Sequence, residues 1–378
     1  RSWPMPAADP SPRHYDIVIV GGGLAGASLA VALADSPYRV AIIEAYPFDS
    51  EAQPSYDERT IALTYSARHI FSQLGVWDED IEVEACPLKS IHISNRGHFG
   101  KTRLDHRDVG TEALGYVVPT RALGKALNKK LEGIDNIDFY CPFEARSVDT
   151  KKQSARVTVA NEAEDRVIDL ECQLLVIADG GRSPLLTSLG FVRESKTYSQ
   201  SALLSIVKTS LDHRYRAYER FVEDGPLALL PMHGQRFAVV WTLAPESLQH
   251  IASLPDEEFI DALQEVFGTH AGLFSDPTPR KQYPLGKSML LTPCKQRTVA
   301  LGNAAHTVHP VAGQGFNLGL RDVAELAENL LKSDRRTIDI GSSGFLQAYA
   351  ERREQDTRRV GQFTDGLLTL FTHRSPLV

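Results

Sequence analysis

Two glycine-rich segments lie near opposite ends of this chain of 378 residues. The first reads Gly-Gly-Gly-Leu-Ala-Gly over positions 21–26, and the second extends from Gly302 to Gly319. Glycines at this density let a backbone turn tightly and approach its neighbours closely. Because almost the whole chain separates the two segments, the sequence predicts one large ligand that is contacted from both ends of the polypeptide.

The first segment has the context of a nucleotide-binding unit. Residues 15–20 form an apolar, β-branched run typical of a buried strand, and residues 24–35 form an Ala- and Leu-rich stretch typical of a helix. A second buried strand over 39–43 ends at Glu44. Strand, glycine turn, helix, strand and an acid about 20 residues after the glycines together predict a dinucleotide-binding unit.

Each residue of this unit has a physical role. Gly21 permits the tight turn, Gly23 lets the backbone approach a pyrophosphate, and Gly26 lets the helix pack closely on the strand. The helix N-terminus favours the diphosphate, and Glu44 accepts hydrogen bonds from a ribose. The alternative is the same strand–helix–strand unit with no ligand. Together with the second glycine segment, the unit predicts FAD as the cofactor.

The composition restricts the kinds of partner. The net charge of −7 disfavours a nucleic-acid partner and leaves no polybasic patch for a membrane. No apolar run approaches the ~18–20 residues that a transmembrane helix needs. The four cysteines are scattered without a C-x-x-C pair, so we predict neither a metal site nor a disulfide framework, and we expect a reducing cytoplasm.

A carboxylate follows a strand in the middle of the chain. Three strands are predicted there, and the last of them runs directly into Asp179 and Gly180. A buried strand that ends in Asp-Gly places an acid and a flexible turn at the carboxyl edge of a sheet, where ligands of α/β proteins bind. The three predicted strands are 156–159, 167–170 and 174–178.

Two more helices are predicted in the first half of the chain, after the nucleotide-binding unit. Residues 57–74 are predicted to form one, with Arg59 near its start, where the simplest role for that side chain is a solvated charge at the helix end. A second predicted helix begins at Arg121 and carries Leu at helical spacing.

Residues 201–284 are predicted to form a β-rich substrate domain with a helix near 256–267. In the predicted strand 227–232, Leu229 and Pro231 alternate and could face the cofactor, and core packing is the alternative role for each. The predicted strands of this domain are 202–207, 218–222, 227–232 and 237–243.

The second glycine segment resembles the long FAD motif of class A flavoprotein aromatic hydroxylases. It follows a predicted strand and contains Gly302-Asn303-Ala304-Ala305-His306, Pro310, Gly313-Gln314-Gly315, Asn317, Gly319 and Asp322. Within the class, the chain is similar to the ubiquinone-biosynthesis hydroxylases. Asn303 stands where most of the class has Asp, and it is characteristic of the branch that acts on 2-octaprenyl-6-methoxyphenol. An Asn oxygen still accepts a hydrogen bond from the ribityl chain.

The resemblance implies which residues contact FAD. We expect the backbone of 313–315, at the start of a helix ending near Lys332, to face the pyrimidine edge of the flavin, where the helix dipole stabilises negative charge. His309 is a candidate catalytic base. The expected FAD contacts are Gly21, Gly23, Gly26, Glu44, Arg59, Arg121, Asp179, Gly180, Asn303, Pro310, Gly313, Gln314, Gly315 and Asn317.

The resemblance also implies an activity. It is that of an NAD(P)H-dependent monooxygenase, with NAD(P)H as a transient reductant, in which a flavin hydroperoxide hydroxylates the ring of a prenylated phenol with molecular oxygen. Expected partners include other ubiquinone-biosynthesis proteins, and the expected location is the cytoplasm, peripherally at the inner face of the membrane. The alternatives are a hydroxylase of a small soluble aromatic compound and a flavin-bearing scaffold of a biosynthetic complex.

The predicted fold is a mixed α/β (α+β) arrangement, with a Rossmann-like FAD-binding domain of the aromatic hydroxylase type and an inserted β-sheet substrate domain. The C-terminal segment is expected to be helical and to lack a final helix. The predicted segments are 13–85, 121–195 and 291–332 for the FAD-binding domain, 86–120 and 196–290 for the substrate domain, and 333–378 for the C-terminal part.

Overall fold

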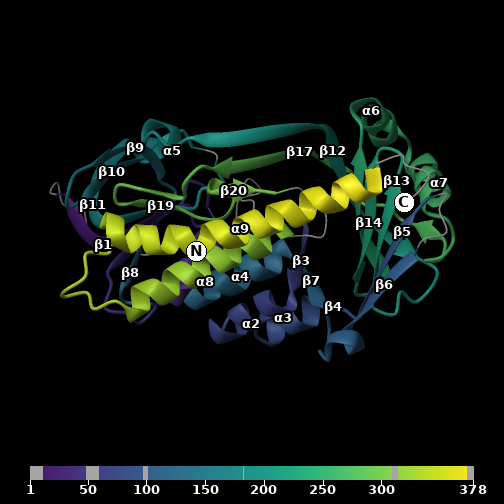
Figure 1. Ribbon diagram of the computed structural model, residues 1–378, viewed down its shortest axis with the longest axis horizontal. Coiled ribbons are helices and arrows are strands. Elements are labelled where there is room, and N and C mark those ends of the chain that lie inside the picture. Colours follow the sequence, from purple (N-terminus) through teal and green to yellow (C-terminus); the bar gives the residue numbers. More distant parts are fainter. Residues whose placement is uncertain (1–11, 48–58, 97–100, 182, 309–313, 373–378) are drawn as a thin grey trace.

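The computed structural model describes residues 12–47, 59–96, 101–181, 183–308 and 314–372. Figure 1 shows an elongated molecule with two regions, each built around its own large sheet. Two long strands, β12 (Arg193–Thr209) and β17 (Lys281–Leu290), run from one region into the other. They pair antiparallel with each other on both sides of a register shift between Thr197 and Ser201, so their backbone hydrogen bonds join the regions.

The first region contains an eight-stranded sheet. Its strands are β1 (Arg13–Val20), β2 (Val40–Ile43), β8 (Ile137–Tyr140), β9 (Glu144–Thr150), β10 (Ala155–Asn161), β11 (Arg166–Ile177), β18 (Cys294–Lys295) and β19 (Thr298–Ala300). Five of them lie parallel in the order β19-β11-β1-β2-β8. Their apolar runs are buried, as expected of parallel strands covered on both faces.

The strand β11 corrects one prediction. The sequence divides 167–170 and 174–178 into two strands, because Glu171 and Gln173 interrupt the apolar run. In the structure they belong to one strand of 12 residues. Its first half pairs antiparallel with β10, and its second half lies parallel to β1 and β19, so that the polar residues stay within the ladder.

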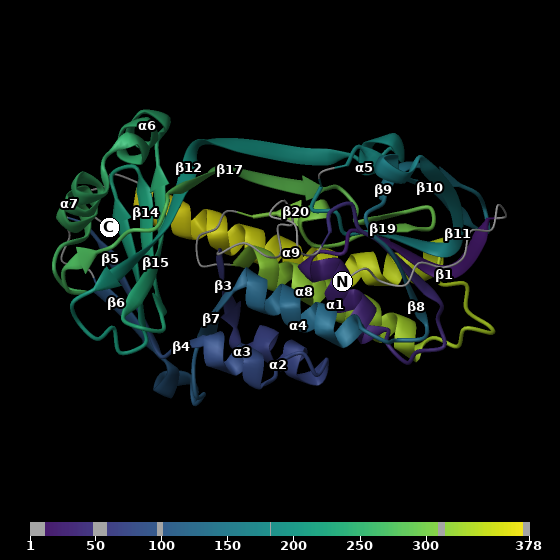
Figure 2. The ribbon, with the colours of Figure 1, turned by 180° about the vertical axis from the view of Figure 1, so that it is seen from behind.

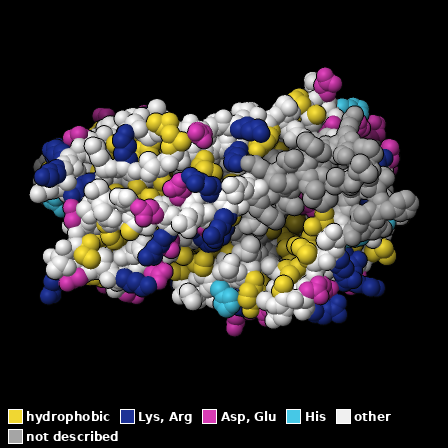
Figure 3. Space-filling view, viewed as in Figure 1, with side chains coloured by type: hydrophobic (Ala, Val, Ile, Leu, Met, Phe, Trp, Pro, Cys, Tyr) yellow, Lys and Arg dark blue, Asp and Glu magenta, His cyan; other side chains and the backbone are white. Residues whose placement is uncertain are grey.

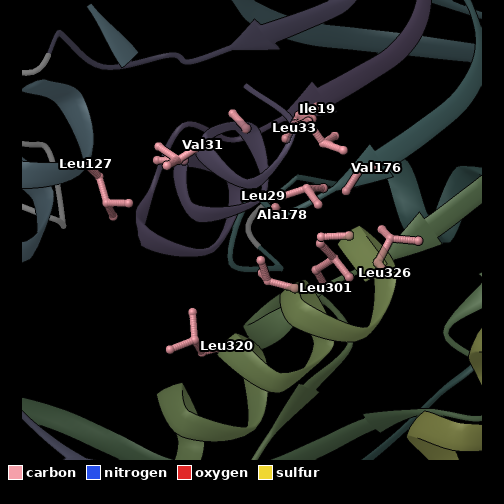
Figure 4. Close-up of a cluster of buried hydrophobic side chains, with 14 of the residues drawn as sticks. Ile19, Leu29, Val31, Leu33, Leu127, Val176, Ala178, Leu301, Leu320 and Leu326 are labelled. Carbon is pink, nitrogen blue, oxygen red and sulfur yellow. The ribbon is translucent and has the colours of Figure 1, made fainter. Parts of the chain in front are cut away.

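Helices cover the parallel sheet, and the core of the first region lies between these helices and the sheet. The helices are α1 (Leu24–Ala32), α4 (Thr120–Leu131), α8 (Gln314–Lys332) and α9 (Ser343–Thr372). From behind, α1, α4 and α8 lie together on one side (Figure 2). In Figure 4, Leu29 of α1 and Leu320 and Leu326 of α8 lie in one buried cluster with Val176 of β11 and with Leu301. Among helices in the described part of the chain, none is both long and apolar enough to cross a membrane.

A three-stranded sheet corrects the helix predicted over 57–74. Residues Thr60–Thr64 form strand β3, and helix α2 (Tyr65–Gln73) begins only after it. The strand forms because Thr60–Thr64 pairs antiparallel with β7 (Gly115–Pro119), which also pairs with β4 (Cys86–Leu88). Thr64 then caps α2, since its hydroxyl accepts a hydrogen bond from the Ala67 N–H. Helix α3 (Glu79–Glu84) precedes β4.

The second region is built on the nine-stranded sheet that contains β12 and β17. Seven further strands belong to this sheet: β5 (Ser90–Asn95), β6 (Lys101–Asp105), β13 (Arg216–Val222), β14 (Gly225–Met232), β15 (Arg236–Leu243), β16 (Phe274–Ser275) and β20 (His306–Thr307). The order is β20-β17-β12-β15-β14-β13-β5-β6, with β16 beside β12.

Each face of this sheet packs against a different part of the molecule. One face packs on α6 (Pro245–Ser253) and α7 (Asp256–Phe267), with a core that includes Leu203, Leu229 and Phe259. The other face contributes Ala217, Met232 and Ala238 to a smaller cluster with β4 and β7. The second face is therefore turned toward the three-stranded sheet and the first region. A short helix, α5 (Leu185–Ser188), and three single turns, 106–109, 162–164 and 302–304, complete the described elements.

Candidate functional site

Four neighbouring parallel strands end at one edge of the sheet, and each carries a motif from the sequence. Glu44 follows β2, the first glycine segment follows β1, Asp179 lies just beyond β11, and the second glycine segment lies just beyond β19. Carboxyl ends of parallel strands are where open α/β sheets bind ligands. The structure therefore brings together at one edge three motifs that lie far apart in the sequence.

The first glycine turn has no room for side chains at two positions. A Cβ on Gly21 would lie 2.5 Å from the Ala178 carbonyl oxygen, and the φ of Gly21 is +104°. A Cβ on Gly26 would lie 1.9 Å from the Gly21 carbonyl oxygen. Gly23 is the N-cap of α1, so the free N–H groups of the first helical turn begin there. This turn has the geometry needed to hold a diphosphate against a helix N-terminus.

Glu44 is hydrogen-bonded to the first glycine turn. Its Oε2 accepts a hydrogen bond of 2.7 Å from the Gly22 N–H, and its Oε1 accepts one of 2.9 Å from the Tyr46 N–H. The residue is buried at the end of β2. An acid at this position is the one that binds the adenosine ribose in dinucleotide-binding folds.

Asp179 organises its own loop. One carboxylate oxygen accepts a hydrogen bond of 2.8 Å from the Gly181 N–H, and the other accepts hydrogen bonds from the N–H and hydroxyl of Ser183. Gly180 and Gly181 have φ angles of +74° and +76°, which favour glycine. A Cβ on Gly181 would lie 3.2 Å from the Asn303 carbonyl oxygen, so this loop lies directly beside the second glycine segment.

The second glycine segment is held by a buried network of charges. Asp322 of α8 accepts hydrogen bonds from the Gly302 N–H at 3.0 Å, from His306 at 2.6 Å and from Arg353 of α9 at 2.7 Å. Burial alone would raise the pKa of Asp322, but the charges of His306 and Arg353 hold it below its usual range. Asp322 thus fixes the turn after β19 to two helices.

The same turn packs against helices through glycine contacts. Gly302 has a φ of +55°, and a Cβ on it would lie 3.5 Å from the Cβ of Ala25 in α1. A Cβ on Gly319 would lie 3.0 Å from the Gly302 Cα. Beside this close contact, the Asn303 side chain is exposed, and a Cβ on Gly315 would be 3.8 Å from its nearest neighbour, Val308. As far as the described residues show, Asn303 and the first turn of α8 are therefore both open to a ligand.

Several predicted FAD contacts lie in other surroundings. Arg59 lies over the ring of Tyr283 at 5.2 Å, at the junction with the second region. Arg121 forms a salt bridge with Glu84, with a shortest distance of 2.6 Å. Asn317 is buried and bonded to β3, since it accepts a 2.8 Å hydrogen bond from the Thr64 N–H and donates one of 2.8 Å to the Ala62 carbonyl.

Other predicted positions cannot be placed in the same way. His309, Pro310 and Gly313 lie outside the described residues. Gln314 and Gly315 form the first turn of α8. In the described part of the chain, no group of His, Cys, Asp or Glu side chains is arranged to hold a metal.

The predicted substrate residues lie on the helix-covered side of β14. Leu229 is completely buried in the cluster with α6 and α7, and Pro231, two residues on, shares its face. The alternate residues of β14, Ala228 and Leu230, are half-buried on the opposite face, toward the first region. The sequence pattern could not have distinguished these faces, because β14 is apolar on both.

FAD fits this arrangement. Gly21 and Gly26 form a turn whose space a Cβ would fill, and Glu44 lies where a ribose binds. The N-terminus of α1 begins at this turn, and α8 packs on the turn after β19 through Gly319 and Gly302. A diphosphate at α1 and a second, extended group along Asn303 and α8 satisfy both ends of a dinucleotide.

Comparison with known families settles the relationship. A family described as "FAD binding domain" matches residues 14–364. The chain belongs to this family. The Ubiquinone hydroxylase UbiL of Rhodospirillum rubrum is 31% identical over 97% of this chain and 84% of its own length. The Ubiquinone hydroxylase UbiM of Neisseria meningitidis is 29% identical over 96% of this chain and 78% of its own length. The human mitochondrial Ubiquinone biosynthesis monooxygenase COQ6 is 26% identical, with coverages of 100% and 90%.

Solved structures of other monooxygenases share the fold. The p-nitrophenol 4-monooxygenase PnpA of Pseudomonas putida superposes with a TM-score of 0.78 at 17% identity, over 97% of this chain and 91% of that one. PqsL of Pseudomonas aeruginosa, in complex with 2-aminobenzoylacetate, gives 0.80 at 19% identity, over 96% and 98%. The predicted mixed α/β fold and the predicted family, that of FAD-dependent monooxygenases related to ubiquinone hydroxylases, are confirmed.

Proposed function

We propose that this flavoprotein hydroxylates the aromatic ring of a polyprenylated phenol in ubiquinone biosynthesis. The observation that carries the proposal is the convergence of all three motifs on one sheet edge, in a chain whose relatives over nearly its full length are named ubiquinone hydroxylases. In the balanced reaction, phenol, oxygen, NAD(P)H and a proton give hydroxylated phenol, water and NAD(P)⁺.

The protein's contribution is binding and orientation. FAD, when bound, supplies the redox chemistry between NAD(P)H and oxygen. Gly21, Gly23 and the start of α1 would hold its diphosphate, Glu44 its adenosine ribose, and Asp179 and Asn303 the segment between. The first turn of α8, with Gln314 and Gly315, would offer free N–H groups to the flavin, since a helix N-terminus stabilises negative charge.

The second region supplies the wall opposite the cofactor. The face of the nine-stranded sheet turned toward β3 and β7 carries half-buried apolar residues, including Leu230 and Ile206. An apolar wall excludes water from the reacting ring and gives a prenyl chain a surface to cover. Since the substrate of this reaction is itself apolar, we propose that the enzyme collects it at the inner face of a membrane or from other ubiquinone-biosynthesis proteins.

The test is a direct assay of oxygen insertion. FAD-loaded protein is incubated with NADH or NADPH, ¹⁸O-labelled oxygen and 2-octaprenyl-6-methoxyphenol, and the product is analysed by mass spectrometry. The expected result is one labelled oxygen atom in the ring. NAD(P)H oxidation without labelled product from any prenylated phenol would refute the proposal. Labelled product from short soluble phenols alone would favour the hydroxylase of small aromatic compounds, and no NAD(P)H oxidation at all would favour the scaffold.

A further inference from the structure

Strand β13 turns one carboxylate toward the first region. Tyr218 and Arg220 lie against Phe267 of α7, with the ring of Tyr218 at 5.3 Å and the guanidinium of Arg220 at 6.0 Å. Ala217 packs in the cluster with β4 and β7. Because side chains alternate along a strand, Glu219 shares the face of Ala217 and is turned away from α7.

Glu219 lies in an apolar row that crosses the sheet. It pairs with Ile93 of β5 and Ala228 of β14, and the row continues through Val240 of β15 to Leu204 of β12. All five residues are half-buried. Figure 3 shows a hollow lined by hydrophobic side chains on the side of the molecule where the three-stranded sheet approaches the nine-stranded one. The row is therefore a half-buried apolar strip with one carboxylate in it.

The carboxyl group of Glu219 has no hydrogen-bond or ion-pair partner among the described residues. Burial raises its pKa to about 7, and no neighbouring charge contributes to the shift. The side chain as a whole is half-buried, and its carboxyl group is the part that burial keeps poorly solvated. An unpaired acceptor in such a place favours a ligand that brings a hydrogen-bond donor.

The ionisable groups around this face are bonded to other partners or lie at its ends. Neither β14, β3 nor β4 carries an ionisable side chain apart from Cys86, which is buried, and Tyr116 of β7 donates to Glu112 at 2.7 Å. The other groups on this side lie at strand ends or at the junction between the regions: Lys208 paired with Asp276, Arg236 bonded to the His233 carbonyl, Lys281 on the exposed end of the row, and Arg59 over Tyr283.

We propose that Glu219 binds the phenolic hydroxyl group of the substrate and accepts its proton. This inference rests on the proposed function, since it assigns the polar contact that orients the substrate ring against the apolar wall. A phenol offers the one donor that the row lacks, and its ring and prenyl chain cover Ile93, Ala228, Val240 and Leu204. Glu219 is then a catalytic residue, because it touches the substrate.

Each proton that moves in this transfer is accounted for. The phenolic O–H bond breaks as an O–H bond forms on the Glu219 carboxylate, and the ring gains the electron density of a phenolate, which favours attack on an electrophilic oxygen. The proton returns to the phenolic oxygen when the ring regains aromaticity and loses its C–H proton to solvent. A base with a pKa near the working pH is the one best suited to such a transfer.

The test separates binding from turnover. FAD-loaded wild type and Glu219→Gln are titrated with a 2-prenylphenol and with its methyl ether, which lacks the donor, and the change in flavin absorbance reports binding. Wild type should prefer the phenol by about tenfold or more, and Glu219→Gln should lose most of this preference, because its neutral amide oxygen accepts a weaker hydrogen bond than a carboxylate. Hydroxylation should fall by about 100-fold, and the rise of kcat/KM with a midpoint near pH 7 should disappear.

Two further variants keep the result decisive. Glu223→Gln, just beyond the end of the same strand and exposed, should behave as wild type. Glu219→Asp, which keeps the acceptor with a shorter reach, should retain part of the preference even where the Gln variant folds poorly. A Glu219→Gln protein that keeps the full wild-type preference for the phenol and the wild-type pH profile would overturn the inference. A wild-type protein that prefers the phenol but inserts no oxygen would instead count against the proposed function.

Discussion

In the proposed function, the two regions of this flavoprotein offer different parts of their sheets to a ligand. The parallel sheet presents the ends of its strands, where Glu44, Gly21, Asp179 and Gly302 line up. The nine-stranded sheet presents a face, with Glu219 among half-buried apolar residues. The turn at a strand end is built from contiguous residues, so its backbone geometry tolerates few substitutions. A sheet face is assembled from every second residue of several strands, so its side chains can be substituted one at a time.

The largest effect is expected at the glycine turn. Gly26→Ala places a Cβ 1.9 Å from the Gly21 carbonyl oxygen, so α1 and the turn have to separate. Bound FAD, measured as the ratio of flavin to protein absorbance, should be lost, together with several degrees of Tm. Gly344→Ala in α9 is the control, since nothing lies within 4 Å of the added methyl group. Equal FAD content in both variants would show that close packing of α1 is not required.

The buried network behind the second glycine segment ranks next. Asp322→Asn breaks the buried ion pair with Arg353, which then keeps only Asp356 as a counter-charge, and breaking a buried pair typically costs about 3–5 kcal/mol. Urea unfolding should show this loss. Glu328→Gln, on the exposed side of the same helix, is the control and should leave the unfolding midpoint nearly unchanged. If both variants unfolded at the same urea concentration, the network would not stabilise the turn.

Asn317 tests whether a predicted FAD contact is instead structural. Asn317→Ala removes its hydrogen bonds to Thr64 and Ala62 and should lower the free energy of unfolding by about 1–3 kcal/mol. The measurement is urea unfolding of apoprotein, which contains no flavin, compared with Asn329→Ala from the same helix. An unchanged apoprotein with weakened FAD binding would instead support a direct role at the cofactor.

The sheet face should show its carboxylate in the pH dependence of stability. Folding raises the pKa of Glu219 from 4.5 to about 7. Between these two pH values, Glu219 keeps its proton in the folded protein and has lost it in the unfolded chain. The stability from this group is therefore present at low pH and lost as pH rises through about 7. The Tm of Glu219→Gln relative to wild type should increase from about pH 5 to about pH 8. A constant difference, as expected for Glu223→Gln, would contradict the buried carboxylate.

The smallest effect is expected at Arg121. Its salt bridge with Glu84 is partly exposed and contributes at most about 1 kcal/mol to stability. Arg121→Gln and Glu84→Gln break the same pair, so both should change Tm slightly. Only Arg121→Gln should also weaken FAD binding, measured by fluorescence titration, if the arginine contacts the cofactor. Equal affinities in both variants would exclude that contact.

Sequence-based interpretation succeeded where local pattern and tertiary structure agree. The strand, turn and helix around Gly21, the helix over 256–267 and the long helix leading to Lys332 were predictable, because glycine geometry and hydrophobic period act over a few neighbouring residues. It failed for Thr60–Thr64, where a strand forms because β7 lies beside it, and for β11, where two partners extend one strand through polar residues.

The sequence by itself determined the strand-end site, since the glycines, Glu44 and the Asp-Gly turn leave few alternatives for the backbone around them. Only the tertiary structure decided which face of β14 meets the first region, and hence that Leu230 rather than Leu229 is on that side. The physical reason is that β14 is apolar on both faces, so its alternation specifies no orientation. The same packing gave Glu219 its surroundings, because a single carboxylate in a strand has no distinguishing local pattern until its neighbours in the sheet are known.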